Sequence, residues 1–164
     1  MNKVLISACL MGSPVRYDGT DLAQNHEIIK RWQQQQRIVP CCPEVAGGLP
    51  TPRTPAELQG CDGTDLIAGH GKVITQANED VTDEFVKGAQ QALELCLSEG
   101  VQLAILTEKS PSCGSSVIYD GSFQRNKIPG QGVTAALLHN NGIKVFNQHQ
   151  LEEADQYLQS IDDC

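Results

Sequence analysis

The chain has 164 residues, of which 40% are hydrophobic and 20% are charged, and this composition predicts a single soluble domain spanning residues 1–164. Its formal net charge of −8 opposes extended contact with nucleic acid or with an anionic membrane, because both require basic surface. Aromatic residues make up 4% of the chain, too few for the base-stacking surface of a single-strand-binding protein. A small, neutral or locally anionic substrate fits these properties better.

No segment reaches the length of a transmembrane helix, so we expect no membrane partner. The apolar stretch from Val4 to Ala8 is also shorter than the roughly 7–15 residues of a secretion signal. We therefore expect a cytoplasmic protein. Because the cytosol keeps thiols reduced, the seven cysteines are expected to be buried, catalytic or metal-bound rather than disulfide-bonded.

Apolar runs and helical periodicity alternate along the chain. The predicted strands are Val4–Ile6, Ile38–Val39, Val101–Leu106 and Ile143–Phe146. The predicted helices are Leu22–Gln35, Val81–Glu99, Val133–Asn141 and Leu151–Leu158, with Asp21 and Asp80 as N-caps of the first two. Leu66–Ala68 and Val73–Thr75 flank a Gly-His-Gly sequence and predict a small β-hairpin.

This alternation indicates an α/β fold, with a three-layer, mainly parallel Rossmann-like sheet, helices on both faces and a small β-hairpin. Ligands bind such sheets at the carboxyl ends of the strands. Cys9 and Cys42 follow the first two predicted strands, and Cys113 lies in the loop after the third. We therefore expect these three thiols to meet at one edge of the sheet.

The second cysteine segment contains two adjacent thiols, Cys41 and Cys42. Adjacent residues of an extended strand point to opposite faces, so one thiol is expected in the core and the other in the site. Pro43 fixes the backbone after Cys42 and favours Cys42 as the functional thiol. Glu44 is a candidate general acid or base, although a solvated glutamate is the commoner role.

Small hydroxyl residues surround the third cysteine. Ser110 and Ser112 can supply hydrogen bonds to a sulfur atom or an anion, although Ser-Pro-Ser is also common in turns. Cys96 lies on the apolar stripe of a predicted helix and is expected in the core, whereas Cys61 lies in a loop and Cys164 ends the chain. The histidines show no metal-ligand spacing. Spacing alone leaves an iron–sulfur cluster, a zinc site and a catalytic thiol open.

Three motifs occur together in one order along the chain. They are Ser-Ala-Cys-Leu-x-Gly with Val-Arg-Tyr-Asp-Gly (Ser7–Gly19), Cys-Pro-Glu-x-x-Gly-Gly-Leu-Pro-Thr-Pro-Arg (Cys42–Arg53) and Lys-Ser-Pro-Ser-Cys-Gly (Lys109–Gly114). In these motifs the chain resembles the bacterial thiouracil desulfidase family. The resemblance implies a [4Fe–4S] cluster held by Cys9, Cys42 and Cys113, with a fourth iron that has no protein ligand.

The resemblance also implies a reaction and a set of roles. The implied reaction is hydrolytic, without electron transfer, and converts 2-thiouracil or 4-thiouracil and water to uracil and sulfide. Glu44 is expected to move the proton of the attacking water, and Ser110 to hydrogen-bond the pyrimidine or the departing sulfur. Ser112, Arg16 and Arg53 are expected to bind the substrate.

Two other functions remain open on the sequence. The first is desulfuration of thiouridine within tRNA, which five basic residues near the expected crevice would serve, although the overall acidity opposes nucleic-acid contact. These residues are Arg16, Arg53, Lys109, Arg125 and Lys127. The second is a non-catalytic sulfur or zinc carrier. The sequence predicts no particular oligomeric state.

Overall fold

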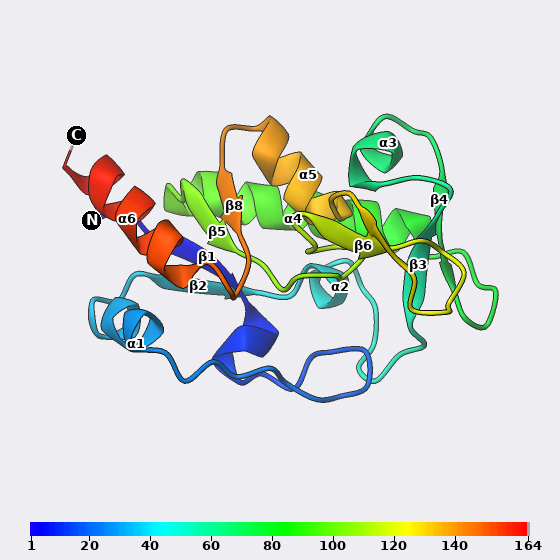
Figure 1. Ribbon diagram of the computed structural model, residues 1–164, viewed down its shortest axis with the longest axis horizontal. Coiled ribbons are helices and arrows are strands. Elements are labelled where there is room, and N and C mark those ends of the chain that lie inside the picture. The colour runs from blue at the N-terminus through cyan, green and yellow to red at the C-terminus, as the bar shows by residue number, and fades with distance from the viewer. Residues whose placement is uncertain (164) are drawn as a thin grey trace.

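The protein is described here by a computed structural model that covers residues 1–163, so Cys164 lies outside the described residues. A four-stranded parallel sheet, in the order β2-β1-β5-β8, forms its centre (Figure 1). The strands are β1 (Val4–Ser7), β2 (Ile38–Cys41), β3 (Ala56–Gln59), β4 (Lys72–Thr75), β5 (Leu103–Ile105), β6 (Val117–Tyr119), β7 (Lys127–Pro129) and β8 (Lys144–Phe146). The helices are the 3-10 helix η1 (Ala8–Met11), α1 (Glu27–Gln34), α2 (Pro43–Ala46), α3 (Gly63–Ile67), α4 (Thr82–Glu99), α5 (Val133–Asn140) and α6 (Leu151–Asp162).

Helices cover both faces of the central sheet. Alternate residues of β1 point to opposite sides, so Ile6 packs with Trp32 of α1 and Leu158 of α6, whereas Leu5 packs with Ala92 of α4. All of these side chains are fully buried, and Leu5, Ile6 and Leu158 each contribute about 1.5–3 kcal/mol through removal from water. The predicted three-layer α/β fold with helices on both faces is confirmed.

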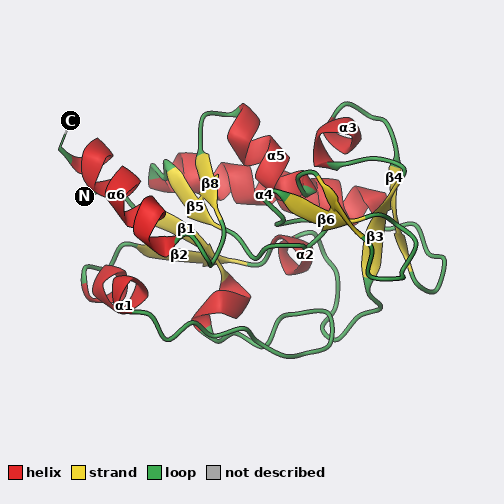
Figure 2. Cartoon of the chain, viewed as in Figure 1, coloured by secondary structure: helices red, strands yellow, loops and turns green. Residues whose placement is uncertain are grey.

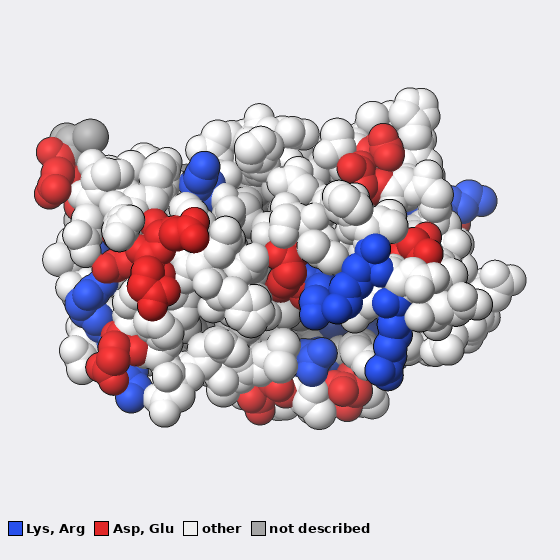
Figure 3. All heavy atoms as spheres, viewed as in Figure 1, with Lys and Arg blue, Asp and Glu red and all other residues white. Residues whose placement is uncertain are grey.

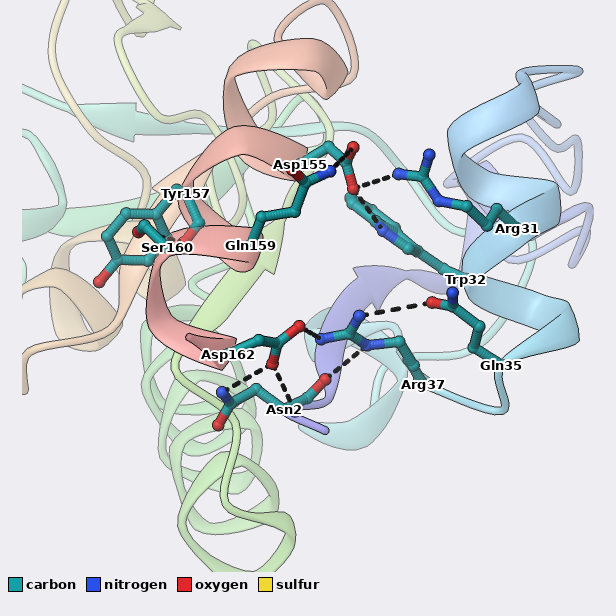
Figure 4. A network of polar contacts seen from close by, with 10 residues as sticks. All are labelled: Asn2, Arg31, Trp32, Gln35, Arg37, Asp155, Tyr157, Gln159, Ser160 and Asp162. Atoms are coloured by element: carbon teal, nitrogen blue, oxygen red, sulfur yellow. Dashed lines mark hydrogen bonds and ion pairs between the residues drawn. The ribbon is translucent and has the colours of Figure 1, made fainter. Parts of the chain in front are cut away.

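A polar network fastens α1 to α6 on one face of the sheet (Figure 4). The buried indole of Trp32 donates from Nε1 to Asp155 Oδ1 at 3.1 Å, and Arg31 pairs with the same carboxylate. Asp162, at the end of α6, accepts at its Oδ2 from Nη2 of Arg37, which follows α1, at 2.6 Å. These bonds hold the last helix against the first, and the two ends of the chain consequently lie close together (Figure 1).

The helix predicted from Leu22 begins only at Glu27, so that prediction is wrong for its first turn. The backbone N–H of Leu22 donates to the carbonyl of Cys9 at 2.8 Å, which holds this segment against η1 instead. Asp21 accepts a hydrogen bond from the backbone of Ala23 and does not cap the helix. His26 caps it, because its Nδ1 accepts from the backbone N–H of Ile28 at 3.1 Å.

The hairpin predicted around the Gly-His-Gly sequence is also wrong. Residues 63–67 form α3, whose capping box joins the side chains of Asp62 and Asp65 to each other's backbone N–H groups. The strand predicted at Val73 exists as β4, but its antiparallel partner is β3, which precedes α3. A second small antiparallel sheet pairs β6 with β7. Both small sheets lie beyond the end of the central sheet (Figure 2).

The longest predicted helix is confirmed as α4. The N-cap residue is Val81 rather than the predicted Asp80, although Asp80 Oδ1 accepts from the backbone N–H of Thr82 at 2.9 Å. Gly100 ends the helix in the left-handed conformation with φ 68°. Within residues 1–163, no helix is both long enough and apolar enough to span a membrane.

The sheet register fixes where the loops emerge. Ser7, the last residue of β1, pairs with Cys41 at the end of β2, and Ile6 pairs with Ile105 at the end of β5. The chain leaves β1 for one neighbour and later returns to the other side of β1 as β5, so the strand order changes direction at β1. Such a switch point is where parallel α/β sheets hold their ligands.

Candidate functional site

A cavity of about 640 Å³ opens at the carboxyl ends of β1, β2 and β5. Cys9, Cys42 and Cys113 all line it, as does Glu44. Its volume lies within the range of small-molecule sites. A second hollow of about 660 Å³ lies among residues near the two chain ends, including Met1 and Asp162, and no cysteine of residues 1–163 lines it. The thiol-lined cavity is therefore the candidate functional site.

Two of the three thiols are fixed by short helical turns. Cys9 lies in η1 directly after β1, and its Sγ is 3.0 Å from the Oγ1 of Thr107, which follows β5. Cys42 is the N-cap residue of α2, and its Sγ lies 3.9 Å from the backbone carbonyl of Val15. The loops after three neighbouring strands thus contact one another across the cavity.

The third thiol, Cys113, is held by hydroxyl groups. Ser110 Oγ accepts from the backbone N–H of Cys113 at 3.2 Å and from that of Ser112 at 3.1 Å. The side chain of Ser7 hydrogen-bonds to Cys113, while the Ser7 oxygen accepts from the backbone N–H of Thr107 at 3.0 Å. Because this acceptor site is filled, the hydroxyl proton of Ser7 is free to point at the Cys113 sulfur.

The three thiols influence one another electrostatically. Burial, together with the nearby Cys42, Glu44 and Cys9, raises the pKa of Cys113 well above its ordinary value. Burial also raises the pKa of Cys42, and the charges of Glu44 and Cys9 add to this increase. Several thiolates can share this cavity only with a cationic group among them. This donor set fits an iron–sulfur cluster, which is held by cysteine thiolates.

The side chains are not grouped around a single ion. Among residues 1–163, no three His, Cys, Asp or Glu side chains are grouped closely enough to hold one metal ion. A cluster of several iron and sulfur atoms needs its cysteine ligands further apart than one zinc ion does. The geometry gives no support to the zinc carrier.

The two adjacent cysteines have different surroundings. Cys41 packs with the buried apolar cluster that contains Cys96, and burial, followed by the charge of Cys42, raises the pKa of Cys41 to about 11. Burial also raises the pKa of Cys96 to about 12. Cys41 reaches part of the cavity wall as well, but the thiol whose charge interacts with Cys9 and Cys113 is that of Cys42.

Glu44 lies in the first turn of α2, at the wall of the cavity. Its side chain is 18% exposed, and its Oε1 lies 3.2 Å from Arg53 Nε. Burial raises the pKa of Glu44, whereas the charge of Arg53 and hydrogen bonds from Arg53 and Ser110 lower it. A carboxyl group whose pKa is subject to these opposing effects can accept and return a proton.

The two serines predicted for the site have different positions. Ser110 lines the cavity, and because its oxygen accepts two backbone N–H groups, its hydroxyl proton can go to Glu44. Ser112 is 1% exposed, and its Oγ lies 2.7 Å from Thr134 Oγ1 in the interior. The structure does not bring Ser112 to the cavity, because this buried hydroxyl pair holds it away.

The two arginines predicted to bind substrate also differ. Arg53 donates to Glu44 at 3.2 Å, to the carbonyls of Pro50 and Val15 at 3.1 and 2.9 Å, and to Thr51 Oγ1 at 3.1 Å. These bonds use four of its five N–H groups, so it positions Glu44 and joins two loops. Arg16 lines the cavity, makes one long bond of 3.4 Å to Thr20, and its charge lowers the pKa of Cys9 against the effect of burial.

Sequence reasoning missed two carboxylates that hold the site loops. Glu108 accepts from the backbone N–H groups of Ser115, Ser116 and Val117 at 2.9–3.2 Å and from Asn147 Nδ2 at 2.7 Å. Burial alone would raise the pKa of Glu108, but these bonds lower it to about 2. Glu57 similarly accepts from the backbone of residues 121 and 123. No local motif marks either residue: Glu57 acts on a loop more than 60 residues away, and Glu108 bonds the loop that follows it and Asn147.

The five basic residues noted in the sequence do gather near the cavity. Arg16, Arg53, Lys109 and Arg125 line it, and a hydrogen bond and the charge of Lys109 lower the pKa of Lys127. Figure 3 shows basic side chains around a hollow on this face, with acidic side chains scattered over the rest of it, some of them beside the hollow. The rim is therefore locally basic on an acidic protein.

Comparison with known proteins gives three concordant matches. Residues 4–150 match the family model described as 2-thiouracil desulfurase. The chain is 41% identical over 150 residues to the uncharacterized protein YbbK of Bacillus subtilis (strain 168), with 92% of this chain and 98% of that protein covered. It is also similar to the solved structure of a [4Fe–4S]-dependent thiouracil desulfidase, TudS, with a TM-score of 0.89 and 45% identity over 97% of this chain and 99% of that one.

Proposed function

The chain belongs to the 2-thiouracil desulfurase family, and we propose that it is an iron–sulfur-dependent enzyme that hydrolyses the thiocarbonyl group of a free thiolated pyrimidine. The observation that carries this proposal is the convergence of Cys9, Cys42 and Cys113 on one cavity beside Glu44. In the reaction, the oxygen of water replaces the thiocarbonyl sulfur of 2-thiouracil or 4-thiouracil, and the sulfur leaves as sulfide. No electron is transferred.

Cys9, Cys42 and Cys113 would hold a [4Fe–4S] cluster as thiolates, and the cluster, when bound with one iron free of protein ligands, supplies a Lewis acid for the substrate sulfur. The structure supports this ligand set because all three thiols are free, line one cavity and interact electrostatically. Free thiols also fit the cytoplasm, where we propose that the enzyme acts.

Glu44 is the proposed general base. It accepts a proton from the attacking water and returns it to the departing sulfur, because its carboxylate lines the cavity and burial raises its pKa above the ordinary value. Arg53 and Ser110 hold the carboxylate in place, so water meets a fixed oxygen. Arg16, whose guanidinium makes one long internal bond, is the residue that we propose contacts the substrate.

The first experiment compares the two adjacent cysteines after anaerobic purification. Cys42→Ala should lose iron, acid-labile sulfide and turnover of 2-thiouracil, whereas Cys41→Ala should keep all three. Cys113→Ala should behave like Cys42→Ala, and Cys96→Ala should behave like Cys41→Ala. Iron lost from Cys96→Ala but kept in Cys113→Ala would contradict the ligand assignment.

The second experiment addresses the base and the substrate. Glu44→Ala should keep the iron and sulfide content of the wild type and lose most of its turnover; unchanged turnover would remove Glu44 from the mechanism. Free 2-thiouracil, free 4-thiouracil and thiolated tRNA should be compared anaerobically. We expect turnover of a free base, because the net charge of −8 opposes extended RNA contact.

A further inference from the structure

The loop between β6 and β7 has an unusual backbone at the cavity wall. Phe123 has φ 58° and Arg125 has φ 61°, although neither is glycine. Residues other than glycine rarely adopt this left-handed backbone conformation. For a bulky residue it is an outlier that the surrounding structure must enforce. Strain of this kind gathers at ligand sites, so the role of the Phe123 side chain requires an explanation.

Side chains of β3 hold this loop in place. Glu57 Oε1 accepts from the backbone N–H of Gly121 at 2.9 Å and from that of Phe123 at 3.2 Å. Gln59 Nε2 donates to the carbonyl of Gly121 at 2.8 Å. A Cβ atom at Gly121 would lie only 2.7 Å from the carbonyl of Leu58, so the loop sits directly on the strand. The loop after β6 and strand β3 lie side by side in Figure 1.

Packing does not account for the Phe123 ring. Phe123 is partly buried and is one of the residues that line the cavity, yet among residues 1–163 it belongs to none of the three buried apolar clusters, and its ring pairs with no other aromatic ring. A strained, anchored aromatic residue that contributes to no core leaves its flat face available to a ligand.

We infer that Phe123 is the stacking residue for the substrate, and that Glu57 is a positioning residue that holds the Phe123 backbone in its strained conformation. The inference rests on the proposed function, since it assigns the wall of the same cavity. It also specifies the substrate class: a planar heteroaromatic thiocarbonyl compound, which stacks on a ring, in preference to a puckered one, which does not.

The test compares planar 2-thiouracil with 5,6-dihydro-2-thiouracil, which carries the same thiocarbonyl and N–H groups on a puckered ring. Phe123→Leu keeps an apolar side chain but removes the flat face. We expect it to raise the KM for 2-thiouracil roughly 5- to 100-fold, to leave the KM for the dihydro compound nearly unchanged, and to keep the iron content. Phe123→Tyr should keep the wild-type KM. Equal KM values for wild type and Phe123→Leu would overturn the inference.

Two further variants separate stacking from folding. Glycine adopts a positive φ without strain, so Phe123→Gly should unfold at a temperature no lower than Phe123→Ala while showing the same raised KM. Glu57→Ala should raise KM without lowering kcat, and Glu57→Gln, which keeps an acceptor oxygen, should recover most of the loss. Ile128→Ala, at an exposed residue on the same hairpin, is the matched control and should leave KM unchanged.

Binding of uracil provides a readout without turnover. In the wild-type holoenzyme, the ring protons of uracil should shift on binding because an aromatic ring lies over them, and Phe123→Leu should remove this shift. Turnover by wild type with no effect of Phe123→Leu on KM or on the shift would reject the stacking role alone. A wild-type protein that carries iron but neither binds uracil nor turns over either substrate would reject the proposed function and the stacking role together.

Discussion

Arg53 Nε lies 3.2 Å from Glu44 Oε1, and the same guanidinium bonds the carbonyls of Val15 and Pro50. One buried side chain therefore fixes the proposed base and joins two loops of the cavity. Arg53, for which the resemblance implies substrate binding, is thus engaged with Glu44 and the loop carbonyls in this structure, and we propose that it positions Glu44.

Arg53→Lys should lower kcat roughly 10- to 100-fold, because lysine keeps the charge but cannot hold several acceptors in one plane. Iron content should remain that of the wild type. Steady-state kinetics under anaerobic conditions provide the measurement. Arg31→Lys, which changes a more exposed arginine paired with Asp155, is the control and should leave kcat unchanged. A wild-type kcat for Arg53→Lys would show that Glu44 needs no such support.

Glu108 should make the free energy of unfolding depend on pH. Its folded pKa of about 2 lies below the ordinary 4.5, so the unfolded chain binds the proton more tightly. The stabilisation is fully present above about pH 4.5 and is lost as pH falls from there toward 2. Glu108→Gln should therefore reduce the free energy of unfolding by about 1.5–3 kcal/mol near pH 7. The deficit should shrink toward pH 3 in urea unfolding, and a deficit equal at both pH values would contradict this account.

Ser110→Ala should impair catalysis more than folding. The hydroxyl accepts from the backbone of Cys113 and bonds Glu44, so its removal frees the carboxylate beside the proposed water. We expect kcat to fall roughly 10- to 100-fold. The iron content should be measured in the same preparation, since a loss of iron would instead place the main role of Ser110 in holding the Cys113 loop.

Ser112→Ala should impair folding more than catalysis. The variant leaves the buried hydroxyl of Thr134 without its 2.7 Å partner, which costs about 1–3 kcal/mol of unfolding free energy. The KM for 2-thiouracil should not change, because Ser112 does not line the cavity. Urea unfolding and steady-state kinetics on the same sample check both statements. A raised KM with unchanged stability would instead support the predicted role of Ser112 in substrate binding.

Asp155→Ala tests the network between α1 and α6. It removes the acceptor of the buried Trp32 indole and the partner of Arg31, so we expect a loss of about 1–3 kcal/mol in unfolding free energy. Iron content and kcat should stay at wild-type values, because these residues do not line the cavity. Tryptophan fluorescence follows the unfolding directly, since Trp32 is the single tryptophan of the chain.

Alternation of strands and helices was enough to predict the central sheet, and the sheet was enough to bring Cys9, Cys42 and Cys113 to one edge. The extended strand correctly predicted that Cys41 and Cys42 have different surroundings, because an extended backbone points adjacent side chains to opposite faces. These predictions rest on local patterns that the fold preserves.

Other features depend on contacts between distant segments. The first turn of the predicted helix at Leu22 is lost to a bond with the carbonyl of Cys9, and no local pattern shows that bond. Ser112 and Ser110 look alike in sequence, but Thr134, 22 residues further on, turns one of them inward. Glu57 and Glu108 escaped notice for the same reason, because an isolated glutamate is most often solvated.

The three cysteines come from loops that meet only after β1 has paired with β2 on one side and β5 on the other. With the proposed ligand set, iron and sulfide could therefore be inserted only after the central sheet has formed. Because buried apolar side chains hold both faces of the sheet together, we expect the chain to fold before the proposed cluster is inserted, unlike small metal-dependent domains that fold around their ion.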